Sequence, residues 1–166
     1  KNAFEAIKEN FKTKEVCLLH GVTSSGKTEI YIKLIEEYIA TESRVLYLLP
    51  EIALTTQLVE RLRSYFGNKV AIFHSKYNNN ERVEVWKNVL ENSAKAQIVI
   101  GARSALFLPF SNLEFIIIDE EHEQTFKQQD PAPRYHARDS AIVLANFHKA
   151  KVILGSATPS IETYYN

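Results

Sequence analysis

The chain has 166 residues, close to the usual size of one domain, and 45% of them are hydrophobic, which is enough for a substantial core. Its formal net charge is zero, so charge gives no support for a nucleic-acid partner, although a local basic groove stays possible. The single cysteine, Cys17, excludes a disulfide or a cysteine zinc cluster within the chain, and its apolar neighbours predict a buried thiol.

Short apolar runs alternate with amphipathic segments along the chain. The expected strands are Val16–His20, Val45–Leu49, Val70–Phe73, Ile98–Gly101, Phe115–Ile118 and Val152–Leu154. The expected helices are Thr28–Ile39, Leu54–Phe66, Glu81–Leu90 and Ala137–Phe147. The strands lack inside–outside alternation, as is typical of parallel strands covered on both faces. This order predicts a single α/β domain over residues 1–166 with a mainly parallel central sheet, which binds ligands at the carboxyl ends of its strands.

The segment Gly21–Thr28 (GVTSSGKT) follows the first expected strand and matches the pattern of a phosphate-binding loop. Its glycines let successive backbone N–H groups face the phosphates, and the helix that follows adds its positive end. Lys27 is expected to reach the β- and γ-phosphates, and the Thr28 hydroxyl to ligate Mg²⁺. The predicted nucleotide-binding residues are Gly21, Thr23, Ser24, Ser25, Gly26, Lys27 and Thr28. The alternative is a glycine-rich turn that binds nothing.

An acidic pair, Asp119-Glu120, follows the apolar run Phe115–Ile118. A carboxylate at the end of a buried strand can hold Mg²⁺, and a second one can orient and deprotonate a water molecule. We assign Asp119 to the metal and Glu120 to the water, so that Lys27, Asp119 and Glu120 are the predicted catalytic residues. A solvated acidic turn is the alternative. A guanine nucleotide is disfavoured, because Asn68–Ala71 lacks the aspartate of a guanine-reading Asn-Lys-x-Asp motif.

A polar turn, Tyr77–Asn80, precedes the third expected helix. Asn80 is a candidate for the helix N-cap, and a solvated turn is the favoured interpretation. A longer mixed loop covers Phe126–Arg138. No apolar run approaches the ~18 residues of a membrane span.

Two motifs, Asp119–His122 (DEEH) and Gly155–Ser160 (GSATPS), together resemble those of superfamily 2 helicases. A more specific resemblance joins them. Leu49–Thr55 (LPEIALT), Ile100–Phe107 (IGARSALF) and Pro133–Asp139 (PRYHARD) are similar to segments of the PriA-type primosomal helicases. The resemblance covers nearly the whole chain.

The resemblance implies the first RecA-like lobe of a larger helicase, a three-layer P-loop NTPase domain that uses ATP and Mg²⁺. Such helicases are bacterial, cytoplasmic enzymes that move 3′ to 5′ on DNA and act in replication restart and primosome assembly. The implied partners are single-stranded and forked DNA, the second helicase lobe and other domains of the parent chain, primosome proteins and single-strand-binding proteins, with no membrane. The second lobe normally supplies an arginine finger, worth about 10³–10⁵ in rate, so the chain alone is expected to bind nucleotide weakly and not to unwind DNA.

The same resemblance places Pro50–Thr55 and Gly101–Ser104 toward the DNA and makes the stretch after DEEH an aromatic-rich loop that couples DNA binding to hydrolysis. The DNA-contact candidates are Arg103, Ser104, Phe126, Lys127, Arg134, Tyr135 and Arg138, since aromatic rings can stack on unpaired bases and basic groups can meet phosphates. His122, Ser156 and Thr158 are the candidates for coupling the nucleotide site to the DNA side. For the loop residues, a core-filling aromatic ring and a solvated basic side chain are the alternatives.

Two other functions fit part of the sequence. A P-loop kinase would transfer phosphate to a small molecule, but GSATPS and the aromatic loop have no obvious use in it. A non-catalytic DNA-binding module would keep the fold without turnover, and the intact acidic pair argues against it.

Overall fold

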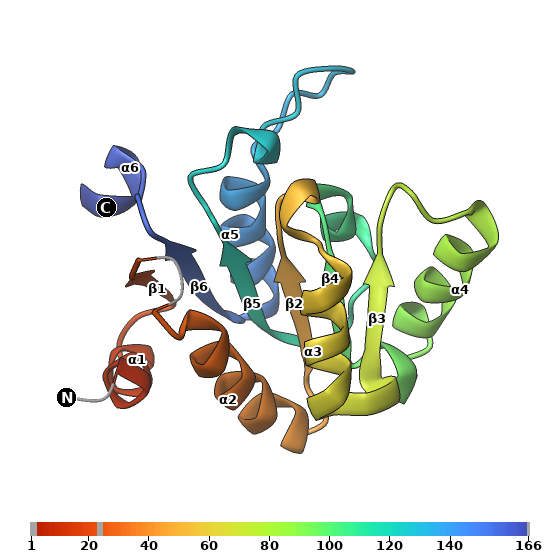
Figure 1. The fold of residues 1–166 in the computed structure, drawn as a ribbon, viewed down its shortest axis with the longest axis horizontal. Helices are drawn as coiled ribbons and strands as arrows, with labels where there is room; N and C mark the ends of the chain where they lie inside the picture. The colour runs from red at the N-terminus through yellow and green to blue at the C-terminus, as the bar shows by residue number, and fades with distance from the viewer. Residues whose placement is uncertain (1–2, 23–24, 166) are drawn as a thin grey trace.

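The computed structural model describes residues 3–22 and 25–165 (Figure 1). Its centre is a six-stranded sheet in the order β1-β6-β5-β2-β4-β3, and every pairing between these strands is parallel. The strands are β1 (Val16–His20), β2 (Arg44–Leu48), β3 (Val70–Phe73), β4 (Ile98–Gly101), β5 (Leu113–Asp119) and β6 (Lys151–Ser156). All six lie where the apolar runs predict them, and the carboxyl ends of β1, β6 and β5 are neighbours.

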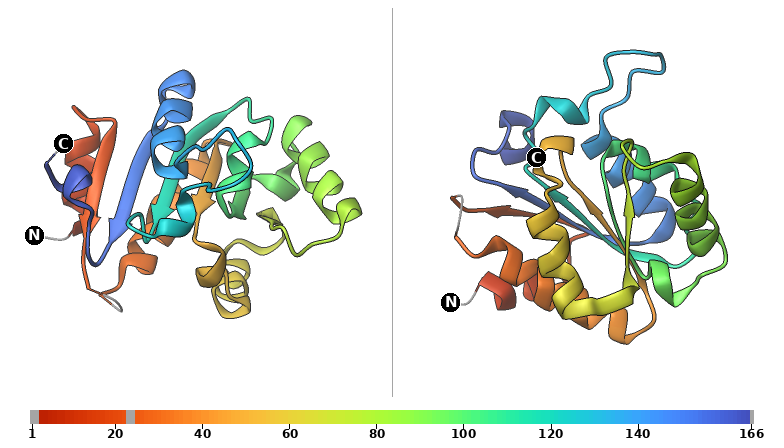
Figure 2. Two further views of the ribbon diagram at one scale, coloured as in Figure 1. Left: turned by 90° about the horizontal axis from the view of Figure 1, so that it is seen from above. Right: turned by 45° about the vertical axis from the view of Figure 1, so that its right-hand side comes forward.

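Helices cover both faces of the sheet, which gives three layers (Figures 1 and 2). The helices α1 (Ala3–Phe11), α2 (Lys27–Ala40) and α3 (Thr56–Phe66) contribute to the core on one face. The helices α4 (Asn79–Leu90) and α5 (Ala137–His148) contribute to the core on the other. A terminal helix α6 (Ile161–Tyr165) and five short 3-10 helices, η1 (Glu51–Ala53), η2 (Gly67–Lys69), η3 (Ala94–Ala96), η4 (Arg103–Phe107) and η5 (Gln124–Phe126), complete the described elements. The α/β, three-layer, RecA-like prediction is confirmed, and Cys17 is buried in β1 as expected.

Helix α2 begins at Lys27, one residue before the predicted start, and the starts of α3 and α4 each differ from the prediction by two residues. The N-cap of α4 is Asn78 and not Asn80, because Asn78 Oδ1 accepts the Glu81 N–H while Glu81 Oε2 accepts the Asn78 N–H, both at 3.0 Å, in a reciprocal capping box. Helix α3 begins at Thr56 rather than Leu54, because the Thr55 hydroxyl accepts the N–H of Leu58 and caps the helix.

Candidate nucleotide site and adjoining nucleic-acid surface

The phosphate loop leads from β1 into α2, as the sequence predicts. Gly26 is the N-cap of α2 with φ 84°, a left-handed conformation that favours glycine. Within the described residues no side chain caps this helix end, so its first-turn N–H groups can serve an anion. The Lys27 side chain is 8% exposed, and its Nζ donates to Gly21 O at 2.9 Å. Ser25 and Thr28 also lie at this end, whereas Thr23 and Ser24 fall outside the described residues.

The acidic residue Glu120 faces the phosphate loop from the end of β5. Its Oε1 lies 3.7 Å from Lys27 Nζ, and its Oε2 lies 3.8 Å from His122 Nδ1. The side chain is 29% exposed and therefore in reach of solvent. Its backbone is left-handed with φ 52°, an uncommon conformation for a residue with a side chain and one that recurs at functional sites. The structure thus brings two of the three predicted catalytic groups together.

The third predicted catalytic residue, Asp119, is fixed by two buried tyrosines. Tyr31 OH donates to Asp119 Oδ1 at 3.1 Å, and Tyr47 OH donates to Oδ2 at 3.2 Å. Burial, followed by the charge of Glu120, raises the pKa of the Asp119 carboxyl, against the smaller opposing effects of Tyr31 and Lys27. Neither tyrosine is among the residues that the sequence singles out, because each looks like a core residue in an apolar segment.

Room for this arrangement depends on Gly155 in β6. A Cβ there would overlap the Tyr31 hydroxyl and would lie 2.8 Å from Asp119 Oδ1. The glycine of the GSATPS segment is therefore required by the close approach of Tyr31 and Asp119.

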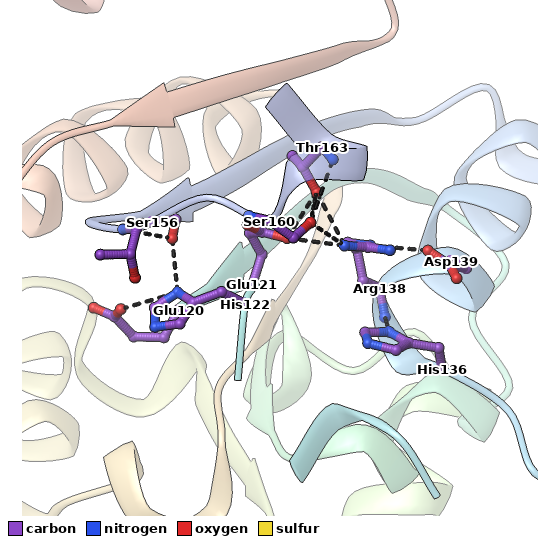
Figure 3. A network of polar contacts seen from close by, with 10 residues as sticks. Glu120, Glu121, His122, His136, Arg138, Asp139, Ser156, Ser160 and Thr163 are labelled. Atoms are coloured by element: carbon purple, nitrogen blue, oxygen red, sulfur yellow. Dashed lines mark hydrogen bonds and ion pairs between the residues drawn. The ribbon is translucent and has the colours of Figure 1, made fainter. Parts of the chain in front are cut away.

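A second polar contact joins the DEEH and GSATPS segments (Figure 3). His122 Nδ1 lies 2.7 Å from Ser156 Oγ, which accepts the N–H of Thr158 at 3.1 Å. Ser156 is fully buried. Its main-chain oxygen accepts the Gly21 N–H at 3.0 Å, so Ser156 also contacts the start of the phosphate loop. The three predicted coupling residues are thus in one contiguous chain of hydrogen bonds.

The residues at this edge fit a magnesium nucleotide. The positive end of α2 and the ammonium of Lys27 suit a phosphate chain. The Thr28 hydroxyl and the Asp119 carboxylate are oxygen donors of the kind that Mg²⁺ prefers, with phosphate and water completing its shell. Bound there, Mg²⁺ would neutralise phosphate charge.

A separate cavity of about 400 Å³ lies at the carboxyl ends of β2 and β4. Its lining includes Pro50, Ile52, Arg103, Phe126 and Lys127. Arg103 Nη1 donates to the main-chain oxygens of Thr125 and Lys127, both at 3.1 Å, and so holds the loop after DEEH against the cavity. Several of the predicted DNA-side residues therefore share one surface, separate from the phosphate loop.

The outer part of that loop is the exposed part. Gln128 N donates to Tyr135 O at 2.9 Å, and Lys127 pairs with His136 in an antiparallel bridge, so the loop folds back on itself (Figure 1). Lys127 and Arg134 are exposed, and the half-buried ring of Tyr135 meets that of the exposed Phe107 edge-on at 5.2 Å. Ser104 is half-buried in η4.

Two predicted DNA contacts need correction. Phe126 is 1% exposed and packs in the core beside α5, so in this conformation its ring cannot stack on a base; it is the core-filling residue of the alternative interpretation. The guanidinium of Arg138 does not face solvent, because its Nη1 donates to Glu121 Oε2 at 3.2 Å, Ser160 Oγ at 2.8 Å and Thr163 Oγ1 at 3.0 Å. The carboxylates of Asp139 and Glu121 outweigh the effect of burial and raise the pKa of Arg138.

The parallel sheet, the loop between β1 and α2 and the acidic end of β5 define a P-loop nucleotide-binding domain of the RecA-like class. The model of the family described as DEAD/DEAH box helicase matches residues 1–166, and the chain belongs to that family.

Among curated proteins, the chain is 48% identical over 164 residues to the replication restart protein PriA of Bacillus subtilis, covering 98% of the chain and 20% of that protein. It is 51% identical over 151 residues to the PriA of Haemophilus influenzae, covering 91% of the chain and 20% of that protein. The chain thus spans about a fifth of the length of these relatives.

Solved structures confirm the fold at low identity. RecG bound to a three-way DNA junction superposes with a TM-score of 0.68 at 19% identity, covering 99% of the chain and 22% of RecG. The DUF1998 helicase MrfA bound to DNA gives 0.71 at 22% identity, covering 96% of the chain and 23% of MrfA. Among the described residues, no helix is both long and apolar enough to cross a bilayer.

Proposed function

We propose that the chain is the ATP-binding motor lobe of a DNA helicase that moves 3′ to 5′ and acts in replication restart. The observation that carries the proposal is the approach of the Lys27 ammonium to within 3.7 Å of the Glu120 carboxylate, at the strand edge where Asp119 is also held. The relatives named replication restart protein PriA supply the particular process, and their high identity supports carrying it over.

Each residue of the site has a role that its surroundings support. Lys27 binds the β- and γ-phosphates, and the N–H groups at the start of α2 surround them. Glu120, which is partly solvent-exposed, orients a water molecule and takes its proton. Asp119 and Thr28 hold Mg²⁺, and the tyrosines that bond Asp119 fix the direction of its oxygens.

The DNA strand is proposed to lie along the cavity at the ends of β2 and β4. Lys127 lines this cavity and is exposed for a phosphate contact. Arg134 is exposed on the outer part of the loop, and Tyr135 with Phe107 offers an aromatic surface to unpaired bases. Arg103 is proposed to position the loop as well as to approach the backbone, because its guanidinium already donates to two loop carbonyls.

The chain is proposed to act beside a second helicase lobe, with primosome and single-strand-binding proteins as further partners in the bacterial cytoplasm. Hydrolysis by the isolated chain is expected to be slow, because an opposing arginine can contribute about 10³–10⁵ in rate.

The test measures ATP hydrolysis by the full-length protein with and without single-stranded DNA, with thin-layer separation of the products. The expected result is release of ADP and inorganic phosphate, stimulated by DNA and lost in Lys27→Ala. Lys33→Ala is the matched control, since Lys33 is an exposed lysine on the same helix. Phosphate on a small-molecule acceptor would instead indicate a kinase. Full restart function in Lys27→Ala would indicate a non-catalytic DNA-binding module.

A further inference from the structure

A buried ion pair closes the base of the loop that follows DEEH. Glu121 is fully buried, and its Oε2 accepts from Arg138 Nη1 at 3.2 Å, while the Arg138 side chain is 14% exposed (Figure 3). Arg138 follows Glu121 by 17 positions in the chain. The loop of residues 123–136, whose outer part is exposed, therefore leaves the body of the protein beside one partner and returns at the other.

The pair is anchored on several sides. Glu121 N donates to Gly155 O at 3.0 Å, and Glu121 Oε1 accepts the N–H of Ser160 at 3.0 Å. Thr163 Oγ1 donates to Glu121 Oε2 at 2.8 Å, and Arg138 Nε donates to Asp139 Oδ1 at 2.9 Å. A carboxylate with this many donors is held in one place, so it moves only when a partner moves.

The neighbours of Glu121 in sequence face the other way. Glu120 lies beside Lys27, and His122 lies beside Ser156. Figure 3 shows the two groups on either side of the same short stretch of chain. Glu120, whose backbone is left-handed with φ 52°, shares a planar peptide unit with Glu121, so a movement of the Glu121 backbone is passed directly to Glu120.

Arg138, the other member of the pair, is connected to the outer part of the loop. His136 Nδ1 accepts the N–H of Arg138 at 3.2 Å and caps α5, and His136 itself pairs with Lys127 across the loop. A displacement of the outer loop is therefore passed to Arg138 through Lys127 and His136.

We propose that the Glu121–Arg138 pair is a positioning element that passes movement of the 123–136 loop to Glu120 and His122, and so links DNA occupancy to ATP turnover. The proposal rests on the proposed function as a DNA-stimulated ATPase. It gives Arg138 a role inside the protein in place of a DNA contact, and it gives a role to Glu121, which the nucleotide chemistry does not use.

The test compares Arg138→Gln with the wild type in the full-length protein. ATP hydrolysis is measured with and without saturating single-stranded DNA, and DNA affinity is measured by fluorescence anisotropy. We expect the ratio of stimulated to unstimulated rate to fall about tenfold or more, the usual range of coupling between sites, while the DNA dissociation constant stays within about threefold. Leu144→Ala, on the same helix and partly buried, controls for general loosening of α5 and should keep the ratio.

A double variant separates coupling from local damage. Glu121→Gln should reduce the ratio as Arg138→Gln does, and the two together should be no worse than either alone, because they remove one shared element. Arg138→Lys keeps the charge and should recover part of the ratio, which also serves if Arg138→Gln fails to fold. A retained ratio in folded Arg138→Gln, a weakened DNA affinity that accounts for the loss, or an equal loss in Leu144→Ala would overturn the proposal. A wild type that DNA does not stimulate would instead refute the proposed function.

Discussion

Replacing Gly155 by alanine tests the packing on which the acidic site depends. The added Cβ would overlap the Tyr31 hydroxyl and would stand 2.8 Å from Asp119 Oδ1 and 3.1 Å from Tyr31 Cζ. Tyr31 is fully buried, so its ring has no free space into which it could turn. Something in the core must shift.

The cost follows from the contacts that are lost. Overpacking a well-packed core costs about 1–3 kcal/mol. Displacing Tyr31 also removes its hydrogen bond to a carboxylate, worth about 1.5–3 kcal/mol. We therefore expect the free energy of unfolding to fall by about 2.5–6 kcal/mol. With a urea m-value of about 2 kcal/mol/M, the midpoint of unfolding should fall by roughly 1.3–3 M.

Tyr31→Phe provides the rescue that identifies the cause. It removes the hydroxyl that the new Cβ would overlap, so Gly155→Ala should cost clearly less in a Tyr31→Phe background. Gly101→Ala is the matched control, because its Cβ would meet Ala105 Cβ and the main-chain oxygen of Phe73 and should gain nothing from Tyr31→Phe. A Gly155→Ala midpoint within about 0.3 M of the wild type, or an equal cost in both backgrounds, would refute this account of Gly155.

Three further outcomes are expected. Glu120→Gln in the full-length protein should keep nucleotide binding and lower turnover by about 10²-fold or more, as shown by titration and hydrolysis assays, and turnover at the wild-type rate would show that Glu120 is not the base. Asn78→Ala should lower the stability of the chain by about 1 kcal/mol in urea denaturation, whereas Asn80→Ala should have little effect, since the capping box belongs to Asn78. Burial raises the pKa of Asp119, so the folded chain holds that proton more tightly than the unfolded chain and loses stability as pH rises from the ordinary carboxyl pKa through the raised one. The stability of Asp119→Asn relative to the wild type, measured by urea denaturation without nucleotide, should therefore increase over that interval and level off above it.

The sheet could be predicted from sequence because its strands are buried on both faces. A strand such as Ile98–Gly101 is apolar at successive positions, and in the structure all of its residues are buried. The shape of the loop between β1 and α2 could be predicted equally well, because the left-handed conformation at Gly26 follows from the local sequence. Local signals of this kind need no knowledge of the partners across the fold.

The support of Asp119 could not be predicted in the same way. Tyr31 lies in α2 and Tyr47 in β2, and both are far from Asp119 in the sequence. Only the order of strands in the folded sheet, in which β2 lies beside β5, brings Tyr47 close to Asp119. A tyrosine in an apolar segment gives no indication of which acceptor its hydroxyl finds. The requirement for Gly155 was hidden for the same reason, since it follows from a close approach between distant segments.

The DNA-contact candidates in the loop after DEEH fall into two groups, one buried and one exposed. Its aromatic and basic residues suggested one DNA-facing set, but Phe126 is buried in the core and Arg138 is bonded to Glu121, while Lys127 and Arg134 are exposed. The first two fix the ends of the loop to the body of the protein. The exposed residues lie between these two fixed ends, so a DNA strand that binds Lys127 and Arg134 would pull on Phe126 and Arg138. Of these two, Arg138 is the one that bonds directly to the DEEH segment, through Glu121.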